Sequence, residues 1–160
     1  MWHQTPIGRC MQAMVLLLSG LAGFGSYAQA IASGQALAQS ADDAQLMWLP
    51  CPFFLPEGCT MAVLHVDAAE ENLDVFFRMP ARSTIPLHWH NSPERMILVA
   101  RRLELTYDDQ QTAVLNPGTY AYGPAKHPHK GYCASEVPCV LFVAYESRLD
   151  ASCSLETTRQ

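Results

Sequence analysis

The sequence predicts an all-β fold, a double-stranded jelly roll, and three observations lead to this fold class. Residues 73–79 alternate between two sets of side chains with a period of two, the pattern of a β-strand. Similar short apolar runs recur after Thr60, separated by turn segments such as Asn91-Ser92-Pro93 and Asn116-Pro117-Gly118. No stretch after Thr60 has helical periodicity. Many short, evenly spaced strands are typical of a sandwich or barrel, and we expect the jelly-roll form.

The first 30 residues have the layout of a secretory signal peptide. Arg9 precedes the largely apolar run Met11 to Phe24, and Ala28-Gln29-Ala30 offers small residues for cleavage. Ala36-Leu37-Ala38 is a second candidate cleavage site. The apolar run is too short for a comfortable membrane span, although a retained N-terminal anchor is the alternative. We therefore expect an exported protein, periplasmic or secreted, that has no membrane contact after cleavage.

The exported part is expected to divide into three regions. Residues 31–59 form a flexible leader and an ordered arm, in which aromatic side chains favour burial while Pro50, Pro52 and Pro56 oppose regular strand pairing. Residues 60–147 form the barrel, and residues 148–160 form a C-terminal tail. Without Arg9, nine basic residues stand against fifteen acidic ones, a net charge of −6. This acidity argues against binding to nucleic acid or to an anionic membrane surface.

The barrel strands follow from the apolar runs and the turns between them. In chain order, we expect strands at Met61–Asp67, Leu73–Met79, Ile85–His90, Arg95–Ala100, Leu103–Tyr107, Thr112–Leu115, Thr119–Tyr122, His129–Cys133 and Cys139–Tyr145.

Five cysteines remain after the expected signal peptide, and an oxidising compartment favours disulfides. Cys51 and Cys59 flank a proline-rich loop, while Cys133 and Cys139 flank what we interpret as a hairpin turn. These two local pairs are the preferred connectivity, which leaves Cys153 unpaired. Spacing alone leaves other pairings open, and a reduced Cys133 in the interior is the alternative.

Four residues form a candidate metal-binding set: His88, His90, Glu94 and His129. Residues two apart on a strand share a face, so His88 and His90 project together. The turn at residues 91–93 is expected to return Glu94 on the neighbouring strand, and only a closed β-fold brings His129 to the same place. Three imidazoles and a carboxylate suit one divalent ion of Fe, Mn, Zn, Ni or Co. The alternative is that the histidines are structural and that Glu94 pairs with a nearby arginine.

The order His-x-His-x3-Glu followed by a distant histidine resembles the double motif of the cupin superfamily. The first motif corresponds to Arg82–Arg101 and the second to Gly118–Cys133, and all four ligand positions match. The final asparagine of the second motif is replaced by Cys133. Three positions that are glycine in the family are occupied by Arg82, Arg101 and Lys126. These departures fall on turns, so they concern turn geometry more than metal binding.

The resemblance extends from Thr60 to Glu146 and is to small single-domain bacterial cupins, which implies two classes of function. One is a small-molecule oxidoreductase of the dioxygenase type, with His127 or Tyr122 as the proton-transferring catalytic residue. The other is a non-catalytic, metal-dependent ligand-binding or sensing module, similar to the cupin portion of zinc-bound anti-sigma regulators. Strand periodicity places Pro86, Met96 and Leu98 towards the cavity. The family's habit also suggests a homodimer.

Overall fold

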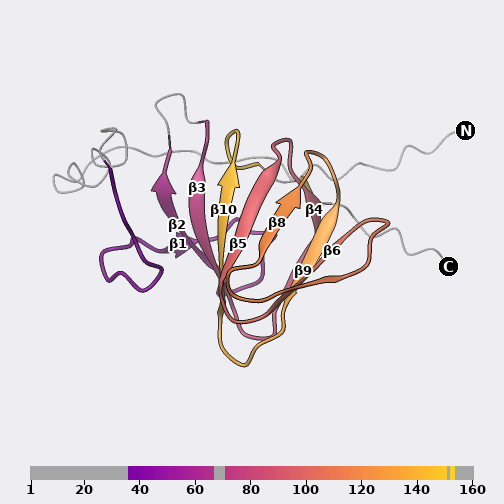
Figure 1. Ribbon diagram of the computed structural model, residues 1–160, viewed down its shortest axis with the longest axis horizontal. Coiled ribbons are helices and arrows are strands. Elements are labelled where there is room, and N and C mark those ends of the chain that lie inside the picture. The colour runs from indigo at the N-terminus through magenta and orange to yellow at the C-terminus, as the bar shows by residue number, and fades with distance from the viewer. Residues whose placement is uncertain (1–35, 67–70, 151, 154–160) are drawn as a thin grey trace, which may run out of the picture.

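A computed structural model describes residues 36–66, 71–150 and 152–153. The expected signal peptide, residues 1–30, lies outside these ranges. The described chain contains no helix, and therefore none that could cross a bilayer. Its strands are β1 (Leu49–Pro50), β2 (Thr60–His65), β3 (Asp74–Met79), β4 (Thr84–Trp89), β5 (Glu94–Ala100), β6 (Leu103–Tyr107), β7 (Ala113–Leu115), β8 (Tyr120–Gly123), β9 (His129–Cys133), β10 (Cys139–Tyr145) and β11 (Ser152–Cys153) (Figure 1). The nine strands expected from the sequence are all present.

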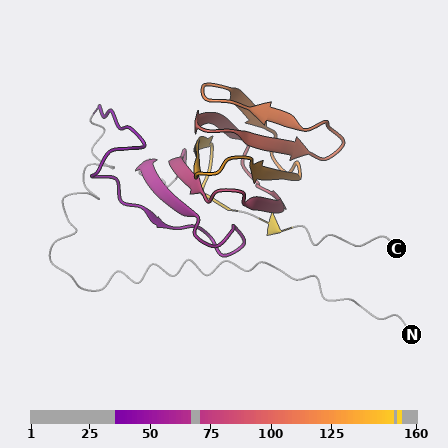
Figure 2. The ribbon, with the colours of Figure 1, turned by 90° about the horizontal axis from the view of Figure 1, so that it is seen from below.

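The strands form two antiparallel sheets. One has the order β1-β2-β3-β10-β5-β8, and the other has the order β11-β4-β9-β6-β7. Most consecutive strands lie in different sheets, so the chain crosses repeatedly between the two layers, as a jelly roll does. The arm and β2 lie at one end of the molecule, and the β6–β7 hairpin lies at the other (Figure 2). The predicted fold class is therefore confirmed.

The main core lies between the sheets and is formed by the inward-facing residues of both. Val75 and Leu98 from one sheet and Leu103 from the other are fully buried. A second, smaller cluster lies on the outer face of the larger sheet, where Leu46 and nearby arm residues pack over β2, β3 and β10. The arm is thus ordered by burial of apolar side chains outside the barrel.

The arm also joins the sheet, which differs from the sequence-based expectation. Strand β1 pairs with β2 through Leu49 opposite Met61 and Pro50 opposite Thr60. Prolines were expected to exclude regular pairing here. Because β1 is the outermost strand of its sheet, the missing N–H of Pro50 can face away from the ladder, which is where a sheet tolerates proline.

Two disulfides connect the pairs that the sequence favoured. Cys51 bonds to Cys59 and Cys133 bonds to Cys139, with Cα–Cα distances of 5.4 and 5.9 Å. Cys133 is fully buried in this bond and offers no thiol to the interior. Residues 134–138 are not the expected hairpin turn, because β9 and β10 lie in different sheets. The second disulfide therefore fastens a crossing between the layers. The side chain of Cys153 lies outside the described part.

The three positions that are glycine in the cupin motif but not in this chain adopt left-handed backbone angles. Arg82, Arg101 and Lys126 have φ angles of 52°, 80° and 61°. This left-handed region favours glycine, because a Cβ atom makes it strained. The turns are therefore formed with side chains in a conformation that glycine adopts more readily, at a cost in backbone strain.

Candidate metal centre

The four candidate ligands come together between the two sheets. His88 is the penultimate residue of β4, and His90 lies just beyond its end. His129 begins β9 directly opposite His88 in the ladder. Glu94 begins β5 in the other sheet, so the turn at residues 91–93 crosses between layers and does not return to a neighbouring strand as expected. All four side chains are buried, with 3–5% of their surface exposed.

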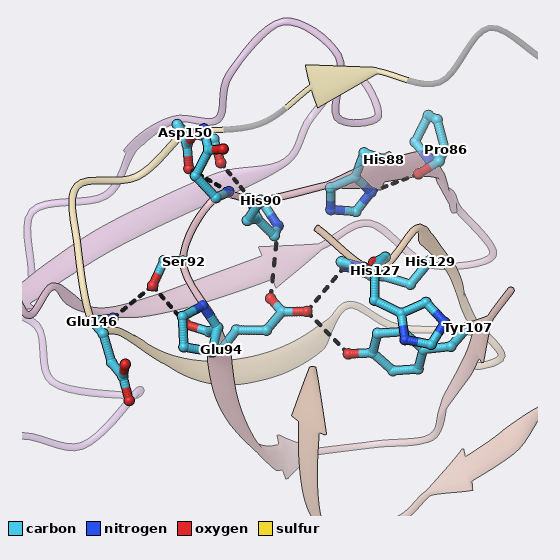
Figure 3. A network of polar contacts seen from close by, with 12 residues as sticks. Pro86, His88, His90, Ser92, Glu94, Tyr107, His127, His129, Glu146 and Asp150 are labelled. Atoms are coloured by element: carbon cyan, nitrogen blue, oxygen red, sulfur yellow. Dashed lines mark hydrogen bonds and ion pairs between the residues drawn. The ribbon is translucent and has the colours of Figure 1, made fainter. Parts of the chain in front are cut away.

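The nitrogen and oxygen atoms of this set converge on one point (Figure 3). One ring nitrogen from each histidine lies within 4.8 Å of those of the other two. The Glu94 Oε1 atom is 3.0 Å from His129 Nε2, and Glu94 Oε2 is 3.7 Å from His90 Nε2. Atoms of all four side chains thus lie close enough together to contact a shared ion.

Backbone carbonyl groups orient all three imidazoles. His88 Nδ1 lies 2.7 Å from the oxygen of Pro86, and His129 Nδ1 lies 3.1 Å from that of His127. His90 Nδ1 contacts the oxygen of Asp150. A carbonyl can only accept a hydrogen bond, so each Nδ1 carries the proton and each Nε2 presents a lone pair. Partners of this kind fix the tautomer of metal-binding histidines.

One of these lone pairs has no protein partner. Within the described residues, His90 Nε2 is the buried side-chain nitrogen or oxygen atom without a hydrogen bond. An unsatisfied buried acceptor is costly, and native structures contain few of them. A cation bound among the three Nε2 atoms and the Glu94 carboxylate would satisfy it. The donor set present here therefore fits a divalent transition metal.

Burial also sets the charge state of the site. It lowers the pKa of His88 to about 3, with the neighbouring His129 and His90 acting in the same direction. Burial likewise lowers the pKa values of His90 and His129. Burial raises the pKa of Glu94, which His90 partly offsets. At neutral pH the imidazoles are uncharged, the form in which they bind metals.

Two residues that the sequence analysis missed support Glu94. The hydroxyl of Tyr107 donates a hydrogen bond of 3.1 Å to Glu94 Oε1, and its ring lies against His129 with centroids 4.9 Å apart. Gly123 pairs with Glu94, and a Cβ atom there would lie 2.3 Å from the Tyr107 hydroxyl. The period-two pattern Leu103, Leu105, Tyr107 could have indicated that Tyr107 faces the interior. Nothing in the sequence marked Gly123.

The expected proton-transferring residues do not join this group. His127 is half-buried and its ring packs against Tyr107, while its Nε2 donates to the Asp108 carbonyl 3.1 Å away. Tyr122 is 51% exposed on the outer face of β8, because the neighbouring Gly123 faces Glu94 and successive residues of a strand alternate. The phenols beside the candidate ligands are instead those of Tyr107 and Tyr145. Tyr107 contacts Glu94, and the ring centroid of Tyr145 is 5.3 Å from that of His90.

A cavity of about 40 Å³ adjoins the four residues. Met96 lines it as expected, and Leu98 is buried. Pro86 does not face inward. An irregularity in the pairing of β4 with β9, between Ile85 and His88, reverses the alternation, so Ile85 lines the cavity and Pro86 is exposed.

Comparison with solved structures gives the same fold. The DMSP lyase DddQ from Ruegeria pomeroyi DSS-3 superposes with a TM-score of 0.59 at 16% identity, over 71% of this chain and 64% of the lyase. The polyketide cyclase RemF from Streptomyces resistomycificus gives 0.61 at 16% identity, over 76% and 89%. An RmlC-like cupin from Shewanella frigidimarina NCIMB 400 gives 0.53 at 16% identity, over 70% and 87%. The chain thus spans about two thirds of the lyase.

No curated protein matches the sequence. The sequence model of the ChrR cupin-like domain matches residues 37–148, which include strands β1 to β10 and all four candidate ligands. The match and the shared fold confirm the resemblance to small cupins. The chain belongs to the ChrR cupin-like domain family.

Proposed function

We propose that this chain is an exported cupin that holds one divalent transition metal through His88, His90, Glu94 and His129. The observation that carries the proposal is the shared orientation of the three imidazoles. Each commits Nδ1 to a backbone carbonyl and turns Nε2 to the centre, where His90 Nε2 has no other partner within the described residues. Three nitrogens and one carboxylate do not fill an octahedral coordination sphere, so positions would remain for water or substrate.

We further propose that the centre acts on a small molecule as an oxidoreductase of the dioxygenase type. When bound, the metal would supply Lewis-acid or redox chemistry at an oxygen-containing substrate. Tyr107 would hold the Glu94 carboxylate, and the carbonyl of His127 would keep His129 in the required tautomer. Apolar walls would exclude bulk water, and Tyr145 lines the cavity with a phenol. Solved enzymes of this fold include an oxalate oxidase, with a TM-score of 0.52 and 15% identity, over 60% of this chain and 55% of that enzyme.

A second candidate is metal-dependent ligand sensing without turnover. The match to the ChrR cupin-like domain supports this alternative, which resembles the cupin portion of zinc-bound anti-sigma regulators. Neither residue expected to transfer protons lines the cavity, which also favours this alternative. Tyr122 is exposed, and His127 donates a hydrogen bond to the Asp108 carbonyl. The two candidates share the metal centre and differ in whether a bound ligand reacts.

The first experiment is metal analysis of the full chain, exported natively. We expect close to one equivalent of a transition metal in the wild type and its loss in a His88→Ala/His129→Ala variant. A His65→Ala variant is the matched control, because this histidine lies on β2, away from the centre. A redox metal together with oxygen uptake on a substrate panel supports the oxidoreductase, and zinc without turnover supports the sensor. A folded wild type that neither contains nor takes up metal refutes both.

Export itself has a separate test. We expect the periplasmic or secreted protein to lack residues 1–30, with both disulfides formed. The intact mass of that fraction shows whether residues 1–30 have been removed. The change in mass on reduction shows whether the disulfides had formed. A full-length mass in the membrane fraction would instead support the retained anchor.

A further inference from the structure

The metal cavity is closed by parts of the chain that lie outside the two cupin motifs. The loop between Cys51 and Cys59, tied at its base by their disulfide, contributes Pro52, Phe54 and Leu55 to the lining. The Phe54 ring lies against the His88 ring, with centroids 5.4 Å apart and planes tilted by 45°. Phe54 therefore covers the face of a candidate ligand and narrows the space beside it.

The lining of the cavity is almost entirely apolar apart from the candidate metal ligands. Besides the four candidate ligands and Tyr145, every side chain that lines the cavity is apolar, and Gly131 adds only backbone. No lysine or arginine of the described chain is among the lining residues. A divalent ion and the Glu94 carboxylate together carry one net positive charge, so the site can neutralise one negative charge of a ligand and no more.

The size of the cavity sets a second constraint. A space of about 40 Å³ holds roughly three water molecules, each needing about 10–15 Å³ by the same measure. A metal with one small coordinating group fills it. A longer ligand can enter only if a lining side chain withdraws, and Phe54, half-buried on a loop, is the lining residue directly against His88.

We propose that the centre takes a small monoanionic or neutral ligand with one metal-binding group and an apolar remainder, and that Phe54 sets the size of that remainder. This inference rests on the metal centre proposed above. A second carboxylate would have to be buried against apolar side chains with no counter-charge, which is strongly unfavourable. The ligand class therefore excludes dicarboxylates whose second group extends away from the metal.

The test uses cobalt-loaded protein and the visible absorption of the cobalt ion, so that it does not depend on turnover. Formate, butyrate and succinate are titrated in turn. Butyrate and succinate have the same number of carbon atoms and differ at the far end, where one has a methyl group and the other a carboxylate. We expect wild-type protein to bind formate more tightly than butyrate, and butyrate at least about tenfold more tightly than succinate.

Variants at two adjacent residues separate the roles of size and charge. Phe54→Ala should strengthen butyrate binding by about tenfold, keep formate binding within about twofold, and leave succinate weak. Phe54→Leu, which retains an apolar side chain of intermediate size, should fall between. Phe53→Ala is the matched control, because Phe53 is 79% exposed and does not line the cavity.

Each outcome bears on a defined part of the reasoning. Succinate binding as tight as butyrate binding overturns the ligand class, and identical behaviour of Phe54→Ala and Phe53→Ala overturns the role of Phe54. If cobalt binds but its visible absorption does not change with any of the three acids, this inference is overturned and the proposed metal centre is still supported. Failure to take up cobalt overturns both.

Discussion

Replacing Gly123 by alanine tests whether the packing around Glu94 governs metal binding. A Cβ atom at this position would lie 2.3 Å from the Tyr107 hydroxyl and 2.7 Å from both Cγ and Oε1 of Glu94. Ordinary contact begins at about 3.4 Å. The Tyr107 hydroxyl must therefore move by about 1.1 Å and the Glu94 carboxylate by about 0.7 Å, or β8 must shift away from β5.

Displacements of this size should affect both metal affinity and stability. Disturbing a residue that supports a metal ligand typically lowers affinity about 10- to 100-fold, and here the ligand itself moves. Insertion of a methyl group into a packed interior costs about 1–3 kcal/mol. We expect both effects in Gly123→Ala. Adding Tyr107→Phe, which removes the closest contact, should recover part of the stability, while the Glu94 contacts keep affinity low.

The assay is competitive metal titration with a chromophoric chelator, combined with urea unfolding of the metal-free protein. Gly118→Ala is the matched control, because Gly118 has a φ angle of 85° but no atom within 4 Å of an added Cβ. It should lose about 1 kcal/mol through backbone strain and keep its metal affinity. Gly123→Ala protein with affinity within twofold of wild type would show that the Glu94 position is not critical.

Three further predictions concern the turns, the tail and pH. Arg101→Gly should raise the free energy of unfolding by roughly 0.5–1 kcal/mol, because it relieves a left-handed φ angle of 80°; unchanged urea midpoints would contradict this. Ending the chain after Ser147 removes the carbonyl that orients His90 and should weaken metal binding about 10- to 100-fold, whereas ending it after Cys153 should not; equal affinities would exclude the role of the tail. Metal-free protein should lose stability between pH 7 and 5.5, since unfolded histidines gain protons below about pH 6.5 while the three buried ones, with lowered pKa values, bind fewer protons. The raised pKa of Glu94 acts in the opposite direction but is one group against three, so a urea midpoint that rises on acidification would refute this balance.

The positions of the cupin motif could be predicted because each has a local physical signature. Alternating apolar residues marked the strands, and the histidine spacing marked the ligands. The motif even located turns whose sequence no longer shows them: Arg82, Arg101 and Lys126 occupy the family's glycine positions and keep left-handed backbone angles. A propensity argument alone would not place a left-handed turn at an arginine or a lysine, since such residues rarely adopt it.

The errors arose where the direction of a side chain depends on strand pairing, which the sequence alone does not show. The irregularity in β4 turned Pro86 outward and Ile85 inward, against simple alternation. Regular alternation does hold in β8, but the sequence does not say which set of residues faces inward: Gly123 faces Glu94, and the candidate Tyr122 is therefore exposed. Which sheet a strand joins is a non-local property, and for that reason the turn before Glu94 could not be recognised as a crossing between layers.

The structure also explains why the motif alone leaves the ligand undetermined. The four candidate ligands come from both sheets of the barrel, and these positions match the superfamily pattern. Barrel side chains line most of the space beside them, but three contributions come from elsewhere: Phe54 from the arm, Leu149 from the tail, and the Asp150 carbonyl that orients His90. Such segments carry little periodicity and lie outside the two cupin motifs, so their contribution emerges only from the packed chain. Selectivity for ligands is therefore expected to depend on the arm and the tail as well as on the barrel, and metal binding on the barrel ligands and on the tail carbonyl that orients His90.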